Sequence, residues 1–221
     1  ILASQSPRRK QLLEWAEVPF DIVVKETDES YPDGLTIDEI AVHIARKKAL
    51  VIKHNSASAM PILAADTIVV LEGRIIGKPK DREGAVNILS SLSGKQHQVV
   101  TGVVILHNEK ETAFAETTEV LFHKLSLAQI EFYVDNYKPY DKAGAYAIQE
   151  WIGVVGIKSV KGDFYNVMGL PVSRVVQALK EPTVERTGST LPWRFVVNLK
   201  RGVRITRSDL DLPLVGQPVI D

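Results

Sequence analysis

The apolar run ILAADTIVVL, residues Ile62–Leu71, constrains the fold of this chain more than any other stretch. Its second half is too rich in β-branched side chains for a helix, so it predicts a strand. Glu72 and Gly73 follow directly and are typical of a hairpin turn. A second pair of strand-like segments, residues 98–106 and 113–122, is joined around the sequence HNEK. The chain is therefore expected to build a sheet that contains at least two hairpins.

Helical patterns alternate with these strands along the chain. Ser126 and Gln129 form a capping-box pattern at the start of one helix, and Asp81 suits the N-cap of another. Strands mixed with helices, with hairpins among the strands, predict an α/β fold with a mixed, twisted sheet and flanking helices. The expected helices are 7–16, 37–53, 82–92, 127–136 and 171–180, and the further expected strands are 1–4, 20–25 and 153–160.

Composition excludes several classes of protein. Lys plus Arg and Asp plus Glu both number 27, so no net field points to nucleic acid or to an anionic membrane. The absence of cysteine removes disulfides and cysteine-based zinc sites, and it suits a cytoplasmic protein. No run approaches the ~18 apolar residues of a membrane span, and no signal peptide is recognised. The 5 histidines show no metal-binding spacing, and serine-hydrolase and dinucleotide-binding motifs are missing.

The first expected helix carries three consecutive cations in the turn where they are least favourable. In ASQSPRRK, Ser6 suits the N-cap and Pro7 the first helical position. Arg8, Arg9 and Lys10 follow at once. The start of a helix already bears a partial positive charge, so each exposed cation there costs roughly 0.3–1 kcal/mol. A phosphate bound at this position would reverse that penalty, because free backbone N–H groups and arginines are phosphate ligands.

Two charged side chains stand where apolar ones are expected. Asp66 lies inside the run ILAADTIVVL, where a carboxylate is costly unless it is paired, bound to a metal or at the end of the strand. Lys48 falls near the middle of the apolar stripe of helix 37–53, on the face of Ala41 and Ile44. The structural alternatives are a carboxylate held by a loop or an arginine, and a lysine that extends to water. The functional alternatives are a catalytic base or metal ligand, and an ammonium that points into a site.

Two loops add further charged groups. The loop ETDES, which contains Glu29, offers the oxygen ligands that hard cations prefer, although such charge runs are often only solvated surface. The loop GKPKD presents Lys78 in a Gly-Lys-Pro turn. It is not a P-loop, because Pro79 stands where the Ser or Thr ligand of Mg²⁺ is needed. Together with the helix start, Lys48 and Asp66, these groups predict a polyphosphate site with a divalent metal.

An ordered series of motifs resembles the Maf family of nucleoside triphosphate pyrophosphatases. The motifs are ILASQSPRRKQLL, ETDES, ARKKA, AADTIV, GKPKD, LSGKQHQVVTGV, DKAGAYAIQ and GLPVSRV, over about residues 1–181. The resemblance implies a Maf- and ITPase-like α/β architecture with two lobes around a cleft, often in a homodimer. It also implies hydrolysis between the α- and β-phosphates, which yields a monophosphate and pyrophosphate, with Mg²⁺ or Mn²⁺ as the divalent metal cofactor.

The resemblance assigns roles to individual residues. It implies that Asp66, in the A-D-T motif, is the proton acceptor and that Lys48 and Lys78 are further catalytic groups. It implies that Glu29 and Asp66 are metal ligands. The implied substrate-binding residues are Ser4, Ser6, Arg8, Arg9, Thr67 and Gln149. Arg8, Thr67 and Gln149 match the type of the family that acts on dTTP and UTP, whereas the 7-methyl-GTP type carries Trp, Gln and Glu there. The amide of a glutamine donates and accepts hydrogen bonds, which suits the imide edge of uracil or thymine.

The resemblance covers residues 1–182 as a pyrophosphatase domain, and residues 183–221 are predicted to be a C-terminal extension of unknown role. The expected function is hydrolysis of dTTP and UTP, with modified pyrimidine nucleotides as further candidates. The alternative is a nucleotide-binding regulator of cell division that acts through a protein partner. A regulator of that kind needs phosphate ligands but no base, so Asp66 in an apolar strand favours the enzyme. The expected partners are a nucleoside triphosphate and a second copy of the chain, with no nucleic acid and no membrane.

Overall fold

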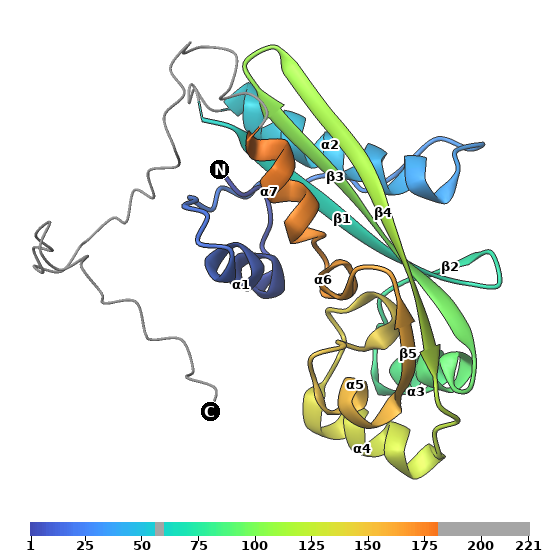
Figure 1. Ribbon diagram of the computed structural model, residues 1–221. Coiled ribbons are helices and arrows are strands. Elements are labelled where there is room, and N and C mark those ends of the chain that lie inside the picture. The colour runs from blue at the N-terminus through green and yellow to red at the C-terminus, as the bar shows by residue number, and fades with distance from the viewer. Residues whose placement is uncertain (56–59, 181–221) are drawn as a thin grey trace, which may run out of the picture. The chain divides into compact units, whose positions relative to one another are not determined.

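The computed structural model describes residues 1–55 and 60–180 as an α/β fold built on one five-stranded sheet (Figure 1). The strand order is β2-β1-β3-β4-β5, and each neighbouring pair of strands is antiparallel. The two expected hairpins, β1–β2 and β3–β4, are confirmed. The predicted C-terminal extension, residues 183–221, lies outside the described residues. The strands are β1 (Ile62–Leu71), β2 (Arg74–Ile76), β3 (Gln96–His107), β4 (Lys110–Phe122) and β5 (Ile157–Lys161).

The helices begin largely where the sequence predicts. The Asp81 carboxylate accepts a hydrogen bond from the backbone of Gly84, and Ser126 and Gln129 form the expected capping box. None of the helices in the described part of the chain combines the length and the apolar character needed to cross a bilayer. The helices are α1 (Pro7–Trp15), α2 (Ile37–Asn55), α3 (Arg82–Leu92), α4 (Leu127–Tyr137), the 3₁₀ helix η1 (Ala143–Ala145), α5 (Trp151–Gly156), α6 (Phe164–Val167) and α7 (Val172–Lys180).

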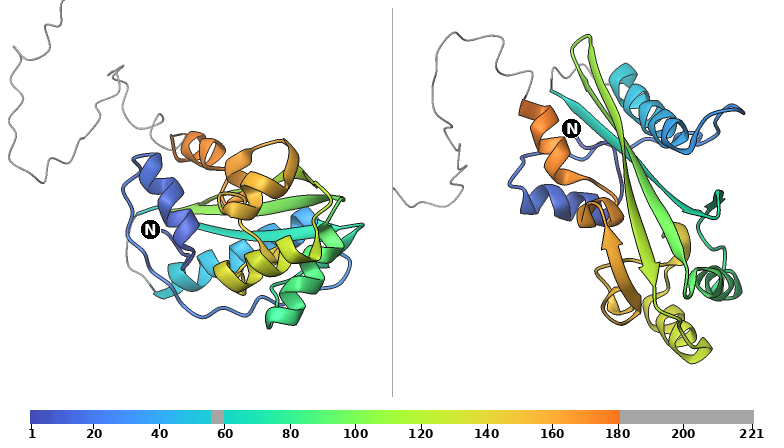
Figure 2. Two further views of the ribbon diagram at one scale, coloured as in Figure 1. Left: turned by 90° about the horizontal axis from the view of Figure 1, so that it is seen from below. Right: turned by 45° about the vertical axis from the view of Figure 1, so that its right-hand side comes forward.

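Helices cover both faces of the central strands. Figures 1 and 2 show α2 against one face and α6 and α7 against the other. Neighbouring residues of β4 reflect this: the Phe114 ring lies 4.2 Å from the Arg174 guanidinium of α7, whereas Ala115 packs in a cluster with side chains of α2. Because both faces are covered, β1 is buried along its length except at Asp66 and Thr67, which are half-buried.

Gly102 of β3 brings α2 into close contact with the sheet. A Cβ atom added at Gly102 would lie 2.2 Å from the carbonyl carbon of Ala41 and 2.3 Å from the nitrogen of Val42, both in the backbone of α2. Gly102 is also the register partner of Asp66 on β1. The glycine therefore sets the distance between α2, which carries Lys48, and the strand that carries Asp66.

The variant Gly102→Ala is expected to lower the free energy of unfolding by roughly 1–3 kcal/mol or more, because the clash is with backbone that cannot move alone. Urea unfolding at pH 7 measures this difference. Gly77→Ala is the matched control, since no atom lies within 4 Å of an added Cβ there. Equal unfolding midpoints for the two variants would contradict the proposed packing constraint.

Two predicted strands at the N-terminal end are reduced to single bridges. Within the described part of the chain, the segments 1–4 and 20–25 pair only through Leu2, which forms parallel bridges with Leu63 of β1 and with Ile22. The parallel part of the expected mixed sheet is therefore limited to these bridges. The backbone N–H of Ala3 still donates to the carbonyl of Leu63, but the chain then turns away into α1, where Pro7 has no N–H to donate to a ladder.

The predicted strand at residues 153–160 is wrong in its first half, which forms α5. The backbone N–H of Gly153 donates to the carbonyl of Glu150 at 2.9 Å. A Cβ at Gly153 would lie 1.7 Å from the carbonyl oxygen of Ile148, so only glycine allows this tight approach. The turn starts a helix, and strand β5 begins only at Ile157.

Candidate functional site

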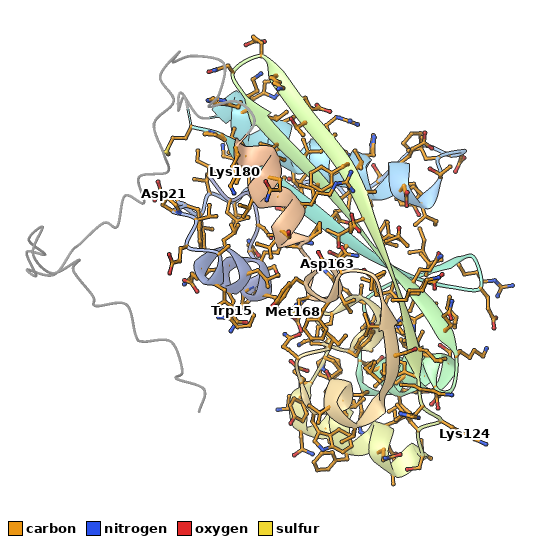
Figure 3. The ribbon with its side chains drawn as sticks, in the orientation of Figure 1. Trp15, Asp21, Lys124, Asp163, Met168 and Lys180 are labelled. Carbon is orange, nitrogen blue, oxygen red and sulfur yellow. The ribbon has the colours of Figure 1, made fainter. Side chains whose placement is uncertain are left out.

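The candidate site is a cleft of about 710 Å³ beside the middle of β1. One edge of β1 pairs with β3, but on the other edge pairing within the described residues is limited to Leu63 and to residues 69–71. Asp66 and Thr67 lie in the gap between these pairings and line the cleft. Met168, labelled in Figure 3, lines the cleft directly after α6. A carboxylate is tolerated in this apolar strand because the strand is open at this point.

The ammonium of Lys48 joins two carboxylates in the cleft. Its Nζ lies 2.7 Å from Asp66 Oδ1 and 2.7 Å from Glu29 Oε1. The side chains of Lys48 and Asp66 are 19% and 15% exposed, so this ion pair is largely screened from water. Lys48 therefore points into the site and does not extend to solvent. The other oxygen of Asp66, Oδ2, accepts no hydrogen bond from the described residues.

The electrostatics of Glu29 reflect the cations around it. Partial burial alone would raise its pKa. The hydrogen bond and charge of Lys48, with the charges of Lys78 and Arg9, outweigh burial, so the pKa of Glu29 lies below its ordinary value. Asp28 of the same loop is more exposed, and it pairs with Lys47 at 2.8 Å on the surface. Only part of this loop therefore belongs to the site.

Arg9, the second arginine of the first turn of α1, is buried in the wall of the cleft. Its Nε donates to the carbonyl of Gly169 at 2.7 Å, and its two terminal nitrogens donate to Ser4 Oγ at 3.1 Å and to Thr67 Oγ1 at 2.9 Å. Burial lowers the pKa of Arg9, and the charge of Asp66 opposes this shift. Since the ordinary pKa of arginine is above ~12, the group stays charged. The Thr67 hydroxyl also contacts Thr101 Oγ1 at 3.0 Å.

The start of α1 faces the same cleft. Ser6 occupies the N-cap position as predicted, but its side chain makes no capping hydrogen bond with the described residues. Its backbone N–H donates instead to Ser4 Oγ at 3.2 Å. Arg8 reaches Asp141 at 3.4 Å, and Lys10 pairs with the exposed Glu14. The three cations thus have three different environments, and Arg8 and Arg9 border the cleft.

Lys78 and Gln149 occupy the margins of the site. Lys78 lines the cleft, is exposed and makes no hydrogen bond with the described residues. Gln149 does not line the cleft. It lines an adjoining hollow of about 510 Å³, which shares Pro7, Arg8, Asp141 and Lys142 with the cleft. Every other predicted site residue lines the cleft itself: Ser4, Ser6, Arg8, Arg9, Glu29, Lys48, Asp66, Thr67 and Lys78.

Lys142 is a site residue that sequence reasoning did not single out. Its side chain is only 10% exposed, and its Nζ lies 2.8 Å from Asp141 and 3.6 Å from Glu150. It sits between the cleft and the hollow and lines both. The signal in the sequence was weak, because an adjacent Asp and Lys before a glycine resemble an ordinary surface turn.

A buried histidine supports one wall of the cleft from behind. Tyr146 lines the cleft, and its hydroxyl lies 2.8 Å from Nε2 of His97. His97 is 2% exposed and packs against the Phe122 ring. Burial lowers the pKa of His97 to about 4. The imidazole is therefore neutral in the folded protein at neutral pH.

This histidine makes stability fall as the pH is lowered. Below pH ~6.5 His97 is protonated in the unfolded chain, whereas in the folded chain it stays neutral down to about pH 4. The free energy of unfolding therefore falls as the pH is lowered through this range. We expect His97 to contribute a loss of roughly 2 kcal/mol between pH 7.5 and pH 5. Urea unfolding at both pH values measures this decrease in the free energy of unfolding. The variant His97→Gln should lack the contribution of about 2 kcal/mol. The control variant His123→Gln, at an exposed histidine, should keep it. The same pH dependence in all three proteins would contradict the prediction.

Comparisons with known proteins place the chain in a family. The model of a family described as Maf-like protein matches residues 1–182. A protein of Cytophaga hutchinsonii named dTTP/UTP pyrophosphatase is 50% identical over 181 residues, which is 82% of this chain and 83% of that protein. Proteins of the same name from Bacteroides thetaiotaomicron and Halalkalibacterium halodurans are 47% and 49% identical, over 82% and 81% of this chain and 94% of each protein. The matched region includes every residue of the cleft and the hollow.

Proposed function

The chain belongs to the Maf family, and from this premise we propose that it is a nucleoside triphosphate pyrophosphatase that hydrolyses dTTP and UTP. The observation that carries the proposal is the pairing of Lys48 with both Asp66 and Glu29 in the cleft, beside the buried cation of Arg9. Carboxylates and cations arranged in this way can accept a proton and hold negative charge at one place. The names of the relatives support the two pyrimidine substrates.

The cleft offers several groups for the phosphates. The start of α1 presents backbone N–H groups and the positive end of the helix dipole. Arg8, at the start of α1, and Lys78, in the loop after β2, both border the cleft, and Lys78 makes no hydrogen bond with the described residues. We propose that the triphosphate binds with its phosphates between Lys78 and the start of α1.

The donor set fits a divalent metal. Asp66 and Glu29 already share one cation, Lys48, and Mg²⁺ is usually held by one or two carboxylates together with substrate phosphates. Among the described residues no group of three or more His, Asp or Glu side chains is placed to hold a metal alone. We propose that Asp66 and Glu29 hold Mg²⁺ or Mn²⁺ when the substrate is present. When bound, such a metal neutralises phosphate charge and polarises the phosphoryl group.

The residues of the chain account for the reaction. Asp66 Oδ1 accepts the hydrogen bond of Lys48, which orients the carboxylate and leaves Oδ2 to accept a proton from water. The water oxygen bonds to the α-phosphorus, and the bond from that phosphorus to the oxygen that bridges to the β-phosphate breaks. Pyrophosphate leaves, and Arg9, Lys48 and Lys78 stabilise the negative charge that develops.

The pyrimidine base is proposed to be recognised in the hollow next to the cleft. Gln149 is exposed there, and its amide makes no hydrogen bond with the described residues, so it can donate to and accept from the imide edge of uracil or thymine. Arg8 borders both the cleft and the hollow, which suits a contact with the sugar or the base. Thr67 lines the cleft only, where its hydroxyl is already held by Arg9 and Thr101.

A panel of nucleoside triphosphates, incubated with Mg²⁺ or Mn²⁺ and analysed by anion-exchange chromatography, tests the proposal. UTP and dTTP should give the monophosphate and pyrophosphate, and excess EDTA should abolish turnover. Diphosphate and orthophosphate would mean cleavage at the γ-phosphate and a different mechanism. Tight nucleotide binding without turnover would favour the division regulator, which no observation on this chain otherwise supports.

Location and oligomeric state are separate proposals. We propose that the enzyme is cytoplasmic. We also propose that it forms a homodimer, as the family resemblance implies. Sedimentation velocity of the purified chain distinguishes a dimer from a monomer. Activity of a monomeric preparation would show that the cleft is complete within one chain.

A further inference from the structure

The turn that carries Gln149 is held at both ends by one buried hydroxyl. The hydroxyl of Tyr133, on α4, accepts a hydrogen bond from the backbone N–H of Ala147 at 3.2 Å. The same hydroxyl donates a hydrogen bond to the carboxylate of Glu150. The Tyr133 side chain is fully buried, and its ring stacks on Tyr137 with 4.9 Å between the centroids. A rigid group on α4 therefore closes a short loop of chain around Gln149.

Further interactions hold the rest of this turn in place. The backbone N–H of Glu150 donates to the carbonyl of Ala147 at 3.1 Å. The Glu150 carboxylate also lies 3.6 Å from Lys142, which pairs with Asp141. Gln149 itself is exposed and has no hydrogen bond with the described residues. The direction of its side chain therefore depends on the backbone turn and on no hydrogen bond of its own with the described residues.

We propose that Tyr133 is a positioning residue, which through Ala147 and Glu150 orients Gln149 for recognition of the pyrimidine base. The inference rests on the proposed function of this site. Tyr133 is not among the described residues that line the cleft or the hollow, so it acts on the substrate only through the turn. Burial, together with the Glu150 carboxylate, raises the pKa of Tyr133, so the hydroxyl keeps its proton and remains a donor.

The variant Tyr133→Phe removes one hydroxyl and keeps the buried ring. It leaves the carboxylate of Glu150 with Lys142 alone and the N–H of Ala147 without its acceptor. Gln149 then samples more directions, which weakens binding of the base without changing the chemistry at Asp66. We expect KM for UTP to rise roughly tenfold and kcat to change less than about threefold. The preference for UTP over CTP should fall as well, because the two bases differ in donors and acceptors at the edge that Gln149 reads.

A double-mutant cycle tests whether Tyr133 acts through Gln149. The four proteins are the wild type, Tyr133→Phe, Gln149→Ala and the double variant, each assayed for kcat and KM with UTP and CTP. In the Gln149→Ala background, Tyr133→Phe should raise KM less than about twofold, because there is no amide left to orient. Tyr137→Phe is the matched control on the same helix, since its hydroxyl makes no hydrogen bond with the described residues, and its KM should equal that of the wild type.

Variants at Glu150 separate positioning from a general loss of structure. Glu150→Gln keeps an acceptor for the Tyr133 hydroxyl and should stay within about threefold of the wild-type KM, whereas Glu150→Ala should resemble Tyr133→Phe. If Tyr133→Phe fails to fold, as judged by its thermal melt, Glu150→Ala replaces it in the cycle.

Three results would overturn the proposal. They are an unchanged KM in Tyr133→Phe, an equal rise in KM with and without Gln149, and a fall in kcat at constant KM. Failure of the proposed function is recognised separately, because the wild type would then release no pyrophosphate from UTP. In that case the same cycle is measured as the Kd for UTP by calorimetry, with the same criterion of coupling.

Discussion

Replacing Asp66 with asparagine is expected to lower kcat for UTP at least ~100-fold, the usual scale for loss of a general base. The amide has the shape of the carboxylate, and its oxygen can still accept the hydrogen bond of Lys48. Its nitrogen, however, takes the place of the oxygen that is proposed to receive the proton of water. The fold should persist, because Asp66 lies in the open gap of β1 and not in the packed part of the strand. Release of pyrophosphate at saturating UTP measures kcat, and circular dichroism checks the fold.

Two further measurements show whether a loss of kcat in Asp66→Asn reflects loss of a general base or of a metal ligand. Asp28→Asn is the matched control, because Asp28 belongs to the neighbouring acidic loop and pairs with Lys47 on the surface. Its kcat should stay within about twofold of wild type, as for a surface change away from the chemistry. Raising Mg²⁺ should not restore Asp66→Asn if Asp66 accepts the proton, whereas recovery would make Asp66 a metal ligand only. A variant that keeps more than about a tenth of the wild-type kcat would remove Asp66 from the role of general base.

Local signals in the sequence account for the parts of the fold that were predicted. The capping box of Ser126 and Gln129 needs only two residues three positions apart, and its hydrogen bonds form as expected. The hairpins follow from turn residues between β-rich runs, and these also lie within a few positions of each other. Such signals depend on the residues of one turn, so a single sequence contains them in full.

One error concerns pairing with a distant strand, and the other concerns a contact between residues only five positions apart. The N-terminal segment has the composition of a strand, but it pairs with β1 only around Leu2 before the chain turns into α1. The helix α5 depends on the close approach of Gly153 to the carbonyl of Ile148, which neither residue type signals by itself. No local pattern records which edge of a strand is left uncovered, and here that edge forms the cleft.

The candidate site was visible in the sequence mainly where charge conflicts with an apolar pattern or with the dipole of a helix start. Asp66 and Lys48 stood out for that reason, and the structure brings them within 2.7 Å of each other. That they meet depends on Gly102, which allows α2 to lie against the sheet. Tyr133 and Lys142 gave no comparable signal, because an aromatic residue on an apolar helix face and a lysine in a polar turn are both ordinary.

Replacing Lys48 with methionine should lower kcat/KM for UTP by a similar factor, about 100-fold. Methionine keeps an unbranched apolar side chain but removes the cation that Asp66 and Glu29 share. The two carboxylates then repel each other and the phosphates of the substrate. Losing one preorganised charge in such a site costs about 3 kcal/mol of transition-state stabilisation, which corresponds to roughly 100-fold in rate. Steady-state kinetics with UTP at fixed Mg²⁺ measures the change.

Lys47→Met provides a control of the same chemistry at the next position. Lys47 pairs with Asp28 and the carbonyl of Ser30 at the surface, outside the pair of carboxylates in the cleft. Because this exposed ion pair lies outside the cleft, kcat/KM should stay within about threefold of wild type. Both variants remove one positive charge from α2, so a general change in the field of the helix would affect them alike. Equal losses in the two variants would therefore show that Lys48 acts only through net charge, whereas a loss confined to Lys48→Met assigns the effect to its contacts with Asp66 and Glu29.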